Sequence, residues 1–203
     1  MKKITLVSCL VIAIALLASA RWGTKAVNAP ADDSLPPSDT SLAVALSVED
    51  MVNQSDVIAI GSCVETKSVW VDRSLVTLAT VSVSESLKGN ETSTITVALP
   101  GGVDANRQIP IAMTYPGAPQ IQPGENVFLF LTASTDVVPG SYTVAGFSQG
   151  KFSIITDEDG IQVVSRDLTK TALKDNNGVR RGSNNMIPLE NLKNQVRGYL
   201  KNQ

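Results

Sequence analysis

The most regular pattern of hydrophobic and polar positions lies in residues 56–89. Two runs rich in Val, Ile, Leu and Thr are joined there by the polar residues 72–74, and branched side chains of this kind favour extended backbone. In the second run Val81, Val83 and Leu87 alternate with serines, a period of two that places one face of a strand in a core and the other in water. The pattern predicts a half-buried antiparallel hairpin.

Further strands are predicted after this hairpin. Ile95, Val97 and Leu99 alternate with polar or small residues as a third strand, which ends at Pro100-Gly101-Gly102. The unbroken apolar run 127–131 is too short for a helix and favours a central strand covered on both faces. Shorter extended pieces are expected at 109–113, 141–147, 151–155 and 161–164, with a tight turn at 157–160.

Two helices are expected on either side of the strands. Ser47 is suited to cap a helix that begins with acidic residues, and Val48, Met51 and Val52 share one side of it. Between residues 188 and 201, apolar side chains recur at helical spacing behind a proline in the first turn. The order predicts a mainly β fold: a small antiparallel barrel over residues 46–165, with a short N-terminal helix and an amphipathic C-terminal helix. A sandwich is the alternative.

The N-terminal residues have the pattern of a secretory signal peptide. Two lysines precede an apolar run from Ile4 to Ala18, and Ala18-Ser19-Ala20 follows, so residues 1–20 are predicted to be cleaved after Ala20. The protein is then exported, to the periplasm or the extracellular space. Retention of this run as an uncleaved anchor is the alternative. Residues 21–45 are rich in Pro, Ala, Asp and Ser and are predicted to form a disordered linker.

Charge is distributed unevenly along the chain. The 203 residues are 43% apolar but only 4% aromatic, which suits one ordinary hydrophobic core. Residues 21–165 hold 7 Lys/Arg against 16 Asp/Glu, whereas residues 166–203 hold 8 against 3. An acidic body is therefore expected to carry a basic tail, residues 166–203, whose C-terminal helix packs on the barrel. Lys193, Arg197 and Lys201 lie opposite its apolar stripe, where they face water or touch anionic lipid.

Two enzyme motifs occur around Ser148. Residues 146–150 match G-x-S-x-G, the nucleophile elbow of α/β hydrolases. The chain contains no histidine, so a Ser-His-Asp triad is impossible within it. Residues 148–151 also match S-x-x-K, which needs a helix that the flanking strands do not favour. A hairpin turn whose glycines adopt positive φ is the favoured interpretation.

Cofactor and metal sites are not expected. Without histidine, and with Cys63 the one thiol after the predicted cleavage, the usual zinc, copper and haem ligand sets are excluded. The acidic residues 157–160 lack the alternating spacing of a calcium loop and favour a solvated turn. Cys63 lies on the strand face shared with Val57 and Ala59, where a thiol packs as a small hydrophobic group; a reactive thiol is the alternative.

Four segments resemble a family of exported bacterial proteins of unassigned function. They are Ser55 to Gly61, Val81 to Gly89 with its Leu-Lys-Gly ending, Pro123-Gly124-Glu125, and Gly146 to Phe152. The pattern is also similar, more distantly, to netrin-like modules and tissue inhibitors of metalloproteinases, whose fold is an OB barrel flanked by helices. Those inhibitors chelate zinc through an N-terminal cysteine, whereas this mature chain would begin with Arg21, so that mechanism does not transfer.

The segment 100–124 is the predicted partner contact. It is longer than an ordinary connection between strands, and loops of this length in compact domains are usually functional or disordered. Its candidate contact residues are Arg107, Ile109, Ile111, Met113 and Tyr115. The alternative is that these side chains fold back to plug the barrel mouth or add an edge strand.

The function expected from the sequence is therefore an exported, non-catalytic binding or inhibitor-like module whose partner is another exported or envelope protein. An envelope-associated accessory protein is the alternative, and an undescribed hydrolase that uses only acids and serines is a third class. Nucleic acid is not an expected ligand, because the strand region is acidic and poor in aromatic residues.

Overall fold

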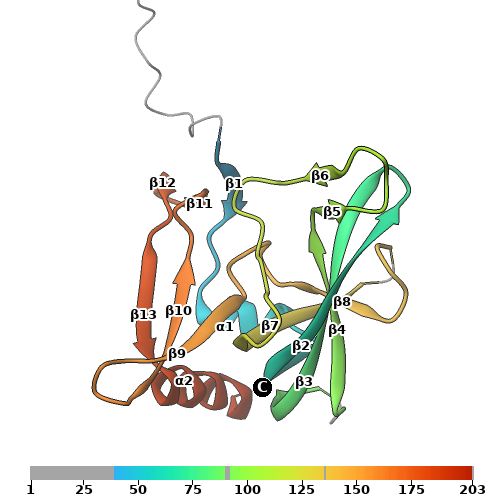
Figure 1. The fold of residues 1–203 in the computed structure, drawn as a ribbon. Helices are drawn as coiled ribbons and strands as arrows, with labels where there is room; N and C mark the ends of the chain where they lie inside the picture. The colour runs from blue at the N-terminus through green and yellow to red at the C-terminus, as the bar shows by residue number, and fades with distance from the viewer. Residues whose placement is uncertain (1–38, 90–91, 135, 203) are drawn as a thin grey trace, which may run out of the picture. The chain divides into compact units, whose positions relative to one another are not determined.

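Strands dominate the part of the chain that the structure describes (Figure 1). The computed structural model describes residues 39–89, 92–134 and 136–202. In chain order the elements are β1 (Ser41–Val44), α1 (Val48–Gln54), β2 (Val57–Val71), β3 (Ser74–Lys88), β4 (Thr94–Pro100), β5 (Gly102–Asp104), β6 (Ile111–Met113), β7 (Asn126–Ser134), β8 (Ser141–Val144), β9 (Lys151–Thr156), β10 (Gln162–Asp167), β11 (Thr171–Asp175), β12 (Gly178–Arg181), β13 (Asn184–Pro188) and α2 (Leu189–Lys201). The mainly β class predicted from the sequence is confirmed.

The predicted hairpin is present as the antiparallel pair β2 and β3. Its turn places Asp72 at a φ of +52°, a left-handed conformation that aspartate tolerates better than most residues. The pairing shifts register within the half of the hairpin away from this turn. Val81 and Val83 pack in one hydrophobic cluster, whereas Leu87 packs in the other. The predicted alternation is thus wrong at Leu87, because each bulge adds a residue and reverses the faces that follow.

Strand β7 is the centre of the main sheet. Its residues Val127–Leu131 are fully buried, as the unbroken apolar run predicted. One edge of β7 pairs with β2, and the opposite edge pairs with β9 in its first half and with β8 in its second. At Phe130 the two partners meet: its N–H donates to the Gly150 carbonyl, and its carbonyl accepts from the Ala145 N–H. Strands β8 and β9 therefore lie end to end along β7, with residues 146–149 looped out.

The strand pairings form a circuit. The eight strands of the main sheet follow the order β13-β10-β9-β7-β2-β3-β4-β8, and β8 pairs again with β7. Strand β8 lies antiparallel to β7 but parallel to β4, where Val97 pairs with Tyr142. The hydrogen-bonded path β2-β3-β4-β8-β7 thus returns to β2. Strands β9, β10 and β13 extend the sheet beyond this circuit.

Two hydrophobic clusters lie on the two faces of β2 and β7. The first contains Cys63, which is 2% exposed, so the core position predicted for this thiol is confirmed. The second contains Phe128 and Phe130 and is covered by both helices. Helix α1 begins with the predicted cap, in which Ser47 and Asp50 hydrogen bond each other's backbone N–H groups. Helix α2 buries Leu189, Leu192 and Val196 against the second cluster, as its apolar stripe predicted.

The structure differs from the predicted boundaries at both ends of the domain. Residues 41–44, assigned to a disordered linker, form β1 and pair in parallel with β11. The basic tail assigned to residues 166–203 also contains β11, β12 and β13. Strands β12 and β13 are short and largely polar, so they leave no clear alternation in the sequence. Strand β11 pairs with its neighbour β12 as well as with the distant β1. The predicted signal peptide, with its cleavage after Ala20, and the start of the linker lie outside the described residues.

Candidate functional site

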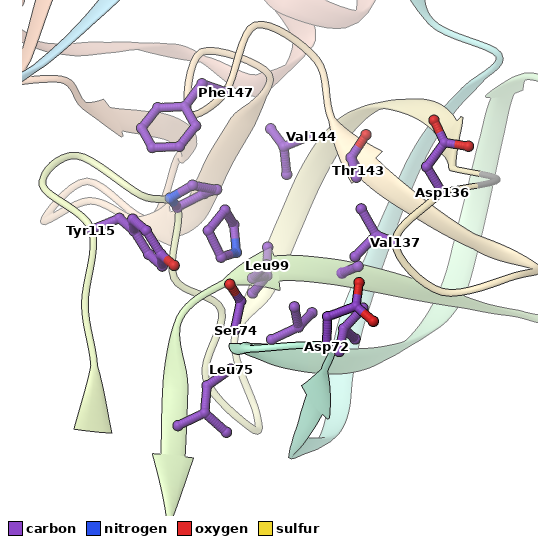
Figure 2. A pocket seen from close by; sticks show the side chains of 15 residues that line it. Asp72, Ser74, Leu75, Leu99, Tyr115, Asp136, Val137, Thr143, Val144 and Phe147 are labelled. Carbon is purple, nitrogen blue, oxygen red and sulfur yellow. The ribbon is translucent and has the colours of Figure 1, made fainter. Parts of the chain in front are cut away.

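A pocket of about 610 Å³ opens beside the turn of the β2–β3 hairpin (Figure 2). We call it the Phe147 pocket. This volume is within the range of sites that bind small organic molecules. Its walls are formed by Val71, Asp72, Ser74, Leu75, Val76, Ala98, Leu99, Pro100, Tyr115, Pro119, Asp136, Val137, Thr143, Val144 and Phe147.

These side chains come from five separate stretches of the chain. The hairpin turn supplies Asp72 and the start of β3, and the end of β4 supplies Leu99 and Pro100. Tyr115 and Pro119 belong to the segment after β6, and the remaining residues lie in the β7–β8 turn, in β8 and in the turn that follows it. Most of the lining is apolar, which favours a ligand that buries hydrocarbon surface.

Phe147 reaches the pocket from a strained turn. Its φ of +66° lies in the left-handed region, which a bulky side chain rarely adopts. The Gly150 N–H closes the turn by donating to the Ala145 carbonyl. A conformation of this kind persists only when the surrounding structure holds it, and Figure 2 shows the Phe147 ring on the wall of the pocket.

Gln149 and Arg166 hold this turn in place. The buried amide of Gln149 donates to the Val44 carbonyl over 2.7 Å and accepts from the Leu46 N–H over 2.9 Å. Arg166 Nη1 donates to the Gln149 carbonyl over 2.9 Å, while its guanidinium lies 4.8 Å from the centre of the Phe152 ring. Burial lowers the pKa of Arg166. The segment after β1 and strand β10 therefore both fix the turn that carries Phe147.

The two ends of the pocket differ in chemistry. Figure 2 places the rings of Tyr115 and Phe147 at one end and the carboxylates of Asp72 and Asp136 at the other. Among the lining residues only these two aspartates carry charge, and none is a lysine or arginine. The aspartates and Tyr115 are exposed, whereas Leu75 and Leu99 are buried. The site thus combines an apolar interior with an acidic rim.

The predicted contact residues of segment 100–124 do not gather in one place. Tyr115, 40% exposed, lines the Phe147 pocket. Met113 lies half-buried in β6, and its sulfur accepts a hydrogen bond from the Leu75 N–H. Ile111 begins β6, which pairs only with the short strand β5 among the described residues. Ile109 is 79% exposed.

Arg107 links the exposed tip of segment 100–124 to Asp104 and to Trp70 of the hairpin. Its Nε donates to Asp104 over 2.9 Å, and its guanidinium lies 5.1 Å from the centre of the Trp70 ring. Trp70 Nε1 donates to the same carboxylate over 2.8 Å. These two hydrogen bonds lower the pKa of Asp104, with the bond from Trp70 the larger cause. This part of the segment therefore contacts the hairpin, while β5 and β6 form a separate two-stranded sheet and add no strand to the edge of the main sheet.

The motif residues around Ser148 lie in a turn between strands, as the sequence predicted. The turn does not form a hairpin, because β8 and β9 both pair with β7 and not with each other. Ser148 is buried, and its Oγ lies 3.3 Å from Thr171 Oγ1. Lys151 Nζ lies 2.5 Å from Glu125 Oε1 and 2.8 Å from Ser153 Oγ. The lysine is therefore engaged by a carboxylate.

Two of the three cations expected to face water or touch anionic lipid are engaged in ion pairs. Lys193 lies 2.8 Å from Glu85 and 3.1 Å from Glu190, and Arg197 lies 3.0 Å from Glu85. The hydrogen bond to Glu85 is the larger cause of a raised Lys193 pKa. Lys201 is exposed in the last helical turn. These pairs fasten α2 to β3, and a lipid contact of this helix stays a prediction.

No cluster of three or more His, Cys, Asp or Glu side chains suited to a metal occurs in the ranges that the structure describes. In the acidic turn 157–160, Asp157 Oδ1 accepts the N–H groups of Asp159 and Ile161. Neither described helix combines the length and apolar character needed to cross a bilayer.

A comparison with protein-family models finds no match, and a comparison with curated proteins finds none either.

Most residues of the Phe147 pocket are not evident from the sequence. Tyr115 is among the candidate contact residues, whereas Phe147, Asp72 and Asp136 are not. One signal was present: a phenylalanine lies between Gly146 and Ser148 in a turn between two strands, where an aromatic side chain has no local reason to occur. No pattern in the sequence brings the β7–β8 turn to the hairpin turn.

Proposed function

We propose that this protein is an exported, non-catalytic binding module with a small OB-type barrel, and that its ligand enters the Phe147 pocket. The order of strand pairing supports the barrel: three strands in a meander, β2-β3-β4, are followed by β8 parallel to β4 and by β7 between β8 and β2. Helices α1 and α2 lie outside that circuit, in the second cluster. Export is supported by the signal-peptide pattern of residues 1–20.

The observation that carries the binding role is the position of Phe147. A positive φ at phenylalanine disfavours folding by roughly 1 kcal/mol or more, and such strain clusters at functional sites. Core packing does not account for it, because the ring is half-buried on the wall of an open pocket. An aromatic ring presented in this way offers a large apolar contact surface to a ligand.

A non-catalytic role is favoured by the chemistry of the pocket lining. General acid–base catalysis draws on His most often, and otherwise on Asp, Glu, Lys, Tyr or Cys. The lining contains no His, Glu, Lys or Cys, and its two aspartates and Tyr115 are exposed to solvent. Apolar contact, rather than bond-making chemistry, is what this lining offers.

Binding of the neutral, apolar dye Nile red tests the proposal. We expect its fluorescence to rise and shift to the blue with the wild-type protein. Phe147→Gly should weaken binding roughly tenfold, because the ring's apolar contact is lost. Glycine accepts the positive φ at this position, which offsets its greater entropy in the unfolded chain, so the variant should melt within a few degrees of the wild-type temperature.

Trp70→Ala is the matched control, since it removes an aromatic ring that does not line the pocket. It should leave dye binding unchanged. Equal loss in both variants, or a wild-type protein that does not bind the dye, would refute the pocket as the binding site.

A further inference from the structure

We propose that the Phe147 pocket selects small organic cations, molecules in which an aromatic or alkyl body carries an ammonium group. This inference rests on the binding role proposed above and adds the chemical class of the ligand. The body would lie in the apolar interior, and the ammonium group would lie at the rim beside Asp72 and Asp136.

The charge of the lining is the first argument. The pocket is lined by two aspartates and by no cationic side chain. Each carboxylate attracts an ammonium group and repels a carboxylate ligand, and the low dielectric of an apolar wall strengthens both effects. An anion of the same shape would therefore bind more weakly than the neutral molecule, and a cation more tightly.

The separation of polar and apolar groups is the second argument. Figure 2 shows Tyr115 and Phe147 away from the two carboxylates, with Leu99 and Val144 between the two ends. A bound molecule that spans the site would contact hydrocarbon at the end with Tyr115 and Phe147, and carboxylates at the end with Asp72 and Asp136. Both aspartates are exposed, so the ammonium group can keep part of its hydration and need not be fully desolvated.

The place of Asp72 in the fold is the third argument. It lies in the two-residue turn of the hairpin with a φ of +52°, so the backbone conformation sets the direction of its side chain. Asparagine adopts this conformation at least as readily as aspartate. Asp72→Asn therefore removes the charge without straining the backbone. The effect of the carboxylate charge on binding can then be measured separately from any change in the turn.

Three ligands with one ring system test the selectivity. They are 1-naphthylmethylamine, 1-naphthalenemethanol and 1-naphthaleneacetic acid, which are cationic, neutral and anionic at pH 7. We expect the amine to bind the wild-type protein roughly threefold to tenfold more tightly than the alcohol, as two exposed carboxylates allow. The acid should bind most weakly. The preference should shrink between 50 mM and 500 mM NaCl, because exposed charges are screened.

The variant Asp72→Asn/Asp136→Asn should bind the amine and the alcohol with equal affinity, while its affinity for the alcohol stays at the wild-type value. Glu158→Gln is the control, since it removes one negative charge from the exposed acidic turn before β10. It should keep the full preference. Melting temperatures of all three proteins establish that each is folded.

The outcomes separate the two proposals. If the alcohol binds but the amine binds no better, the cation selectivity is wrong and the pocket remains a binding site. A preference that survives in the double asparagine variant also overturns it, because the charge then comes from elsewhere. If none of the three ligands binds, the binding role of the pocket falls together with the selectivity.

Discussion

The burial and the pKa of the Cys63 thiol depend on the face of β2 on which it lies. The side chain packs in the first hydrophobic cluster and is 2% exposed. Burial raises the pKa of the thiol, and the negative charge of Glu125 raises it further. Both effects keep the group protonated, and the thiol rather than the thiolate is the unreactive form. At the scale of the residue, the alternation of β2 was enough to predict this environment.

Replacement of Cys63 by serine should lower the free energy of unfolding by about 1 to 3 kcal/mol, because a hydroxyl is buried in an apolar cluster. Within the described part of the chain the thiol donates one hydrogen bond, to the Glu65 carbonyl at 3.5 Å. Urea denaturation measures the loss. Cys63→Ala is the control, since it removes the sulfur and adds no polar group, and it should be less destabilising than serine.

A thiol reagent provides a second measurement on the same residue. In a Cys9→Ser background, Cys63 should be modified only at the rate of unfolding. Rapid labelling of the native protein would contradict the buried position.

Glu125 shows how one side chain links elements that are distant in the chain. It precedes β7, and its Oε1 accepts hydrogen bonds from Lys151 Nζ at 2.5 Å and Ser153 Oγ at 2.7 Å, both on β9. Its own carbonyl accepts the Cys63 N–H of β2. Burial acts to raise the pKa of Glu125, but the hydrogen bonds from Lys151 and Ser153 outweigh it and hold the pKa below 4.5. The start of β7 is thereby fixed between two neighbours.

This linkage predicts a pH-dependent stability. A carboxyl whose pKa is lower in the folded state stabilises the fold above its unfolded pKa, near 4.5, and loses that contribution as pH falls through the folded pKa. Glu125→Gln should therefore be less stable than wild type by about 1 to 3 kcal/mol at pH 7. Below pH 4.5 the difference should shrink.

Urea midpoints at pH 7, 5 and 3.5 measure the effect. Glu158→Gln, a change at an exposed turn, should show no such trend. A gap between wild type and Glu125→Gln that stays constant with pH would argue against the ion pair.

The register shifts between β2 and β3 determine on which face of the sheet each side chain of β3 lies. Val81, Val83 and Leu87 are spaced for one face, with Glu85 at the position between the last two, yet Leu87 packs in the cluster opposite to Val81 and Val83. Alternation encodes a period of two but not an added residue, because the register of a bulge depends on the partner strand. At the scale of the element, the hairpin was predictable and its register was not.

The segment 100–124 divides into an exposed tip and a part that contributes to the fold. Residues 105–110 are exposed, whereas Pro119 and Ile121 are buried. Replacing Ala105–Pro110 with Asn-Gly should join β5 to β6 by a tight turn. We expect a melting temperature within a few degrees of wild type and unchanged Nile red binding, since Tyr115 and Pro119 are retained.

Replacing Arg107–Gln120 with a short Gly/Ser bridge is the contrasting variant. It removes Pro119, Tyr115 and the contact of Met113 with Leu75, so we expect it to melt many degrees lower. An unchanged melting temperature in this variant would instead favour a solvated loop that serves only as a partner contact.

Much of the architecture followed from the sequence itself. The capping residues at Ser47, the apolar stripe of α2, the buried run of β7 and the burial of Cys63 all depend on neighbours within one element. Local patterns encode such features directly, because periodicity and capping act over a few residues. Composition likewise excluded a Ser-His-Asp triad, since the chain has no histidine.

Only the tertiary structure decided how these elements meet. Strand β1 exists because it pairs with β11, and β8 and β9 lie end to end because both hydrogen bond to β7. The Phe147 pocket combines the turn at Asp72 with the turn at Asp136 and with Phe147. Backbone pairing between distant segments is set by the packing of the whole domain and leaves little trace in any one segment, so the site became visible only in three dimensions.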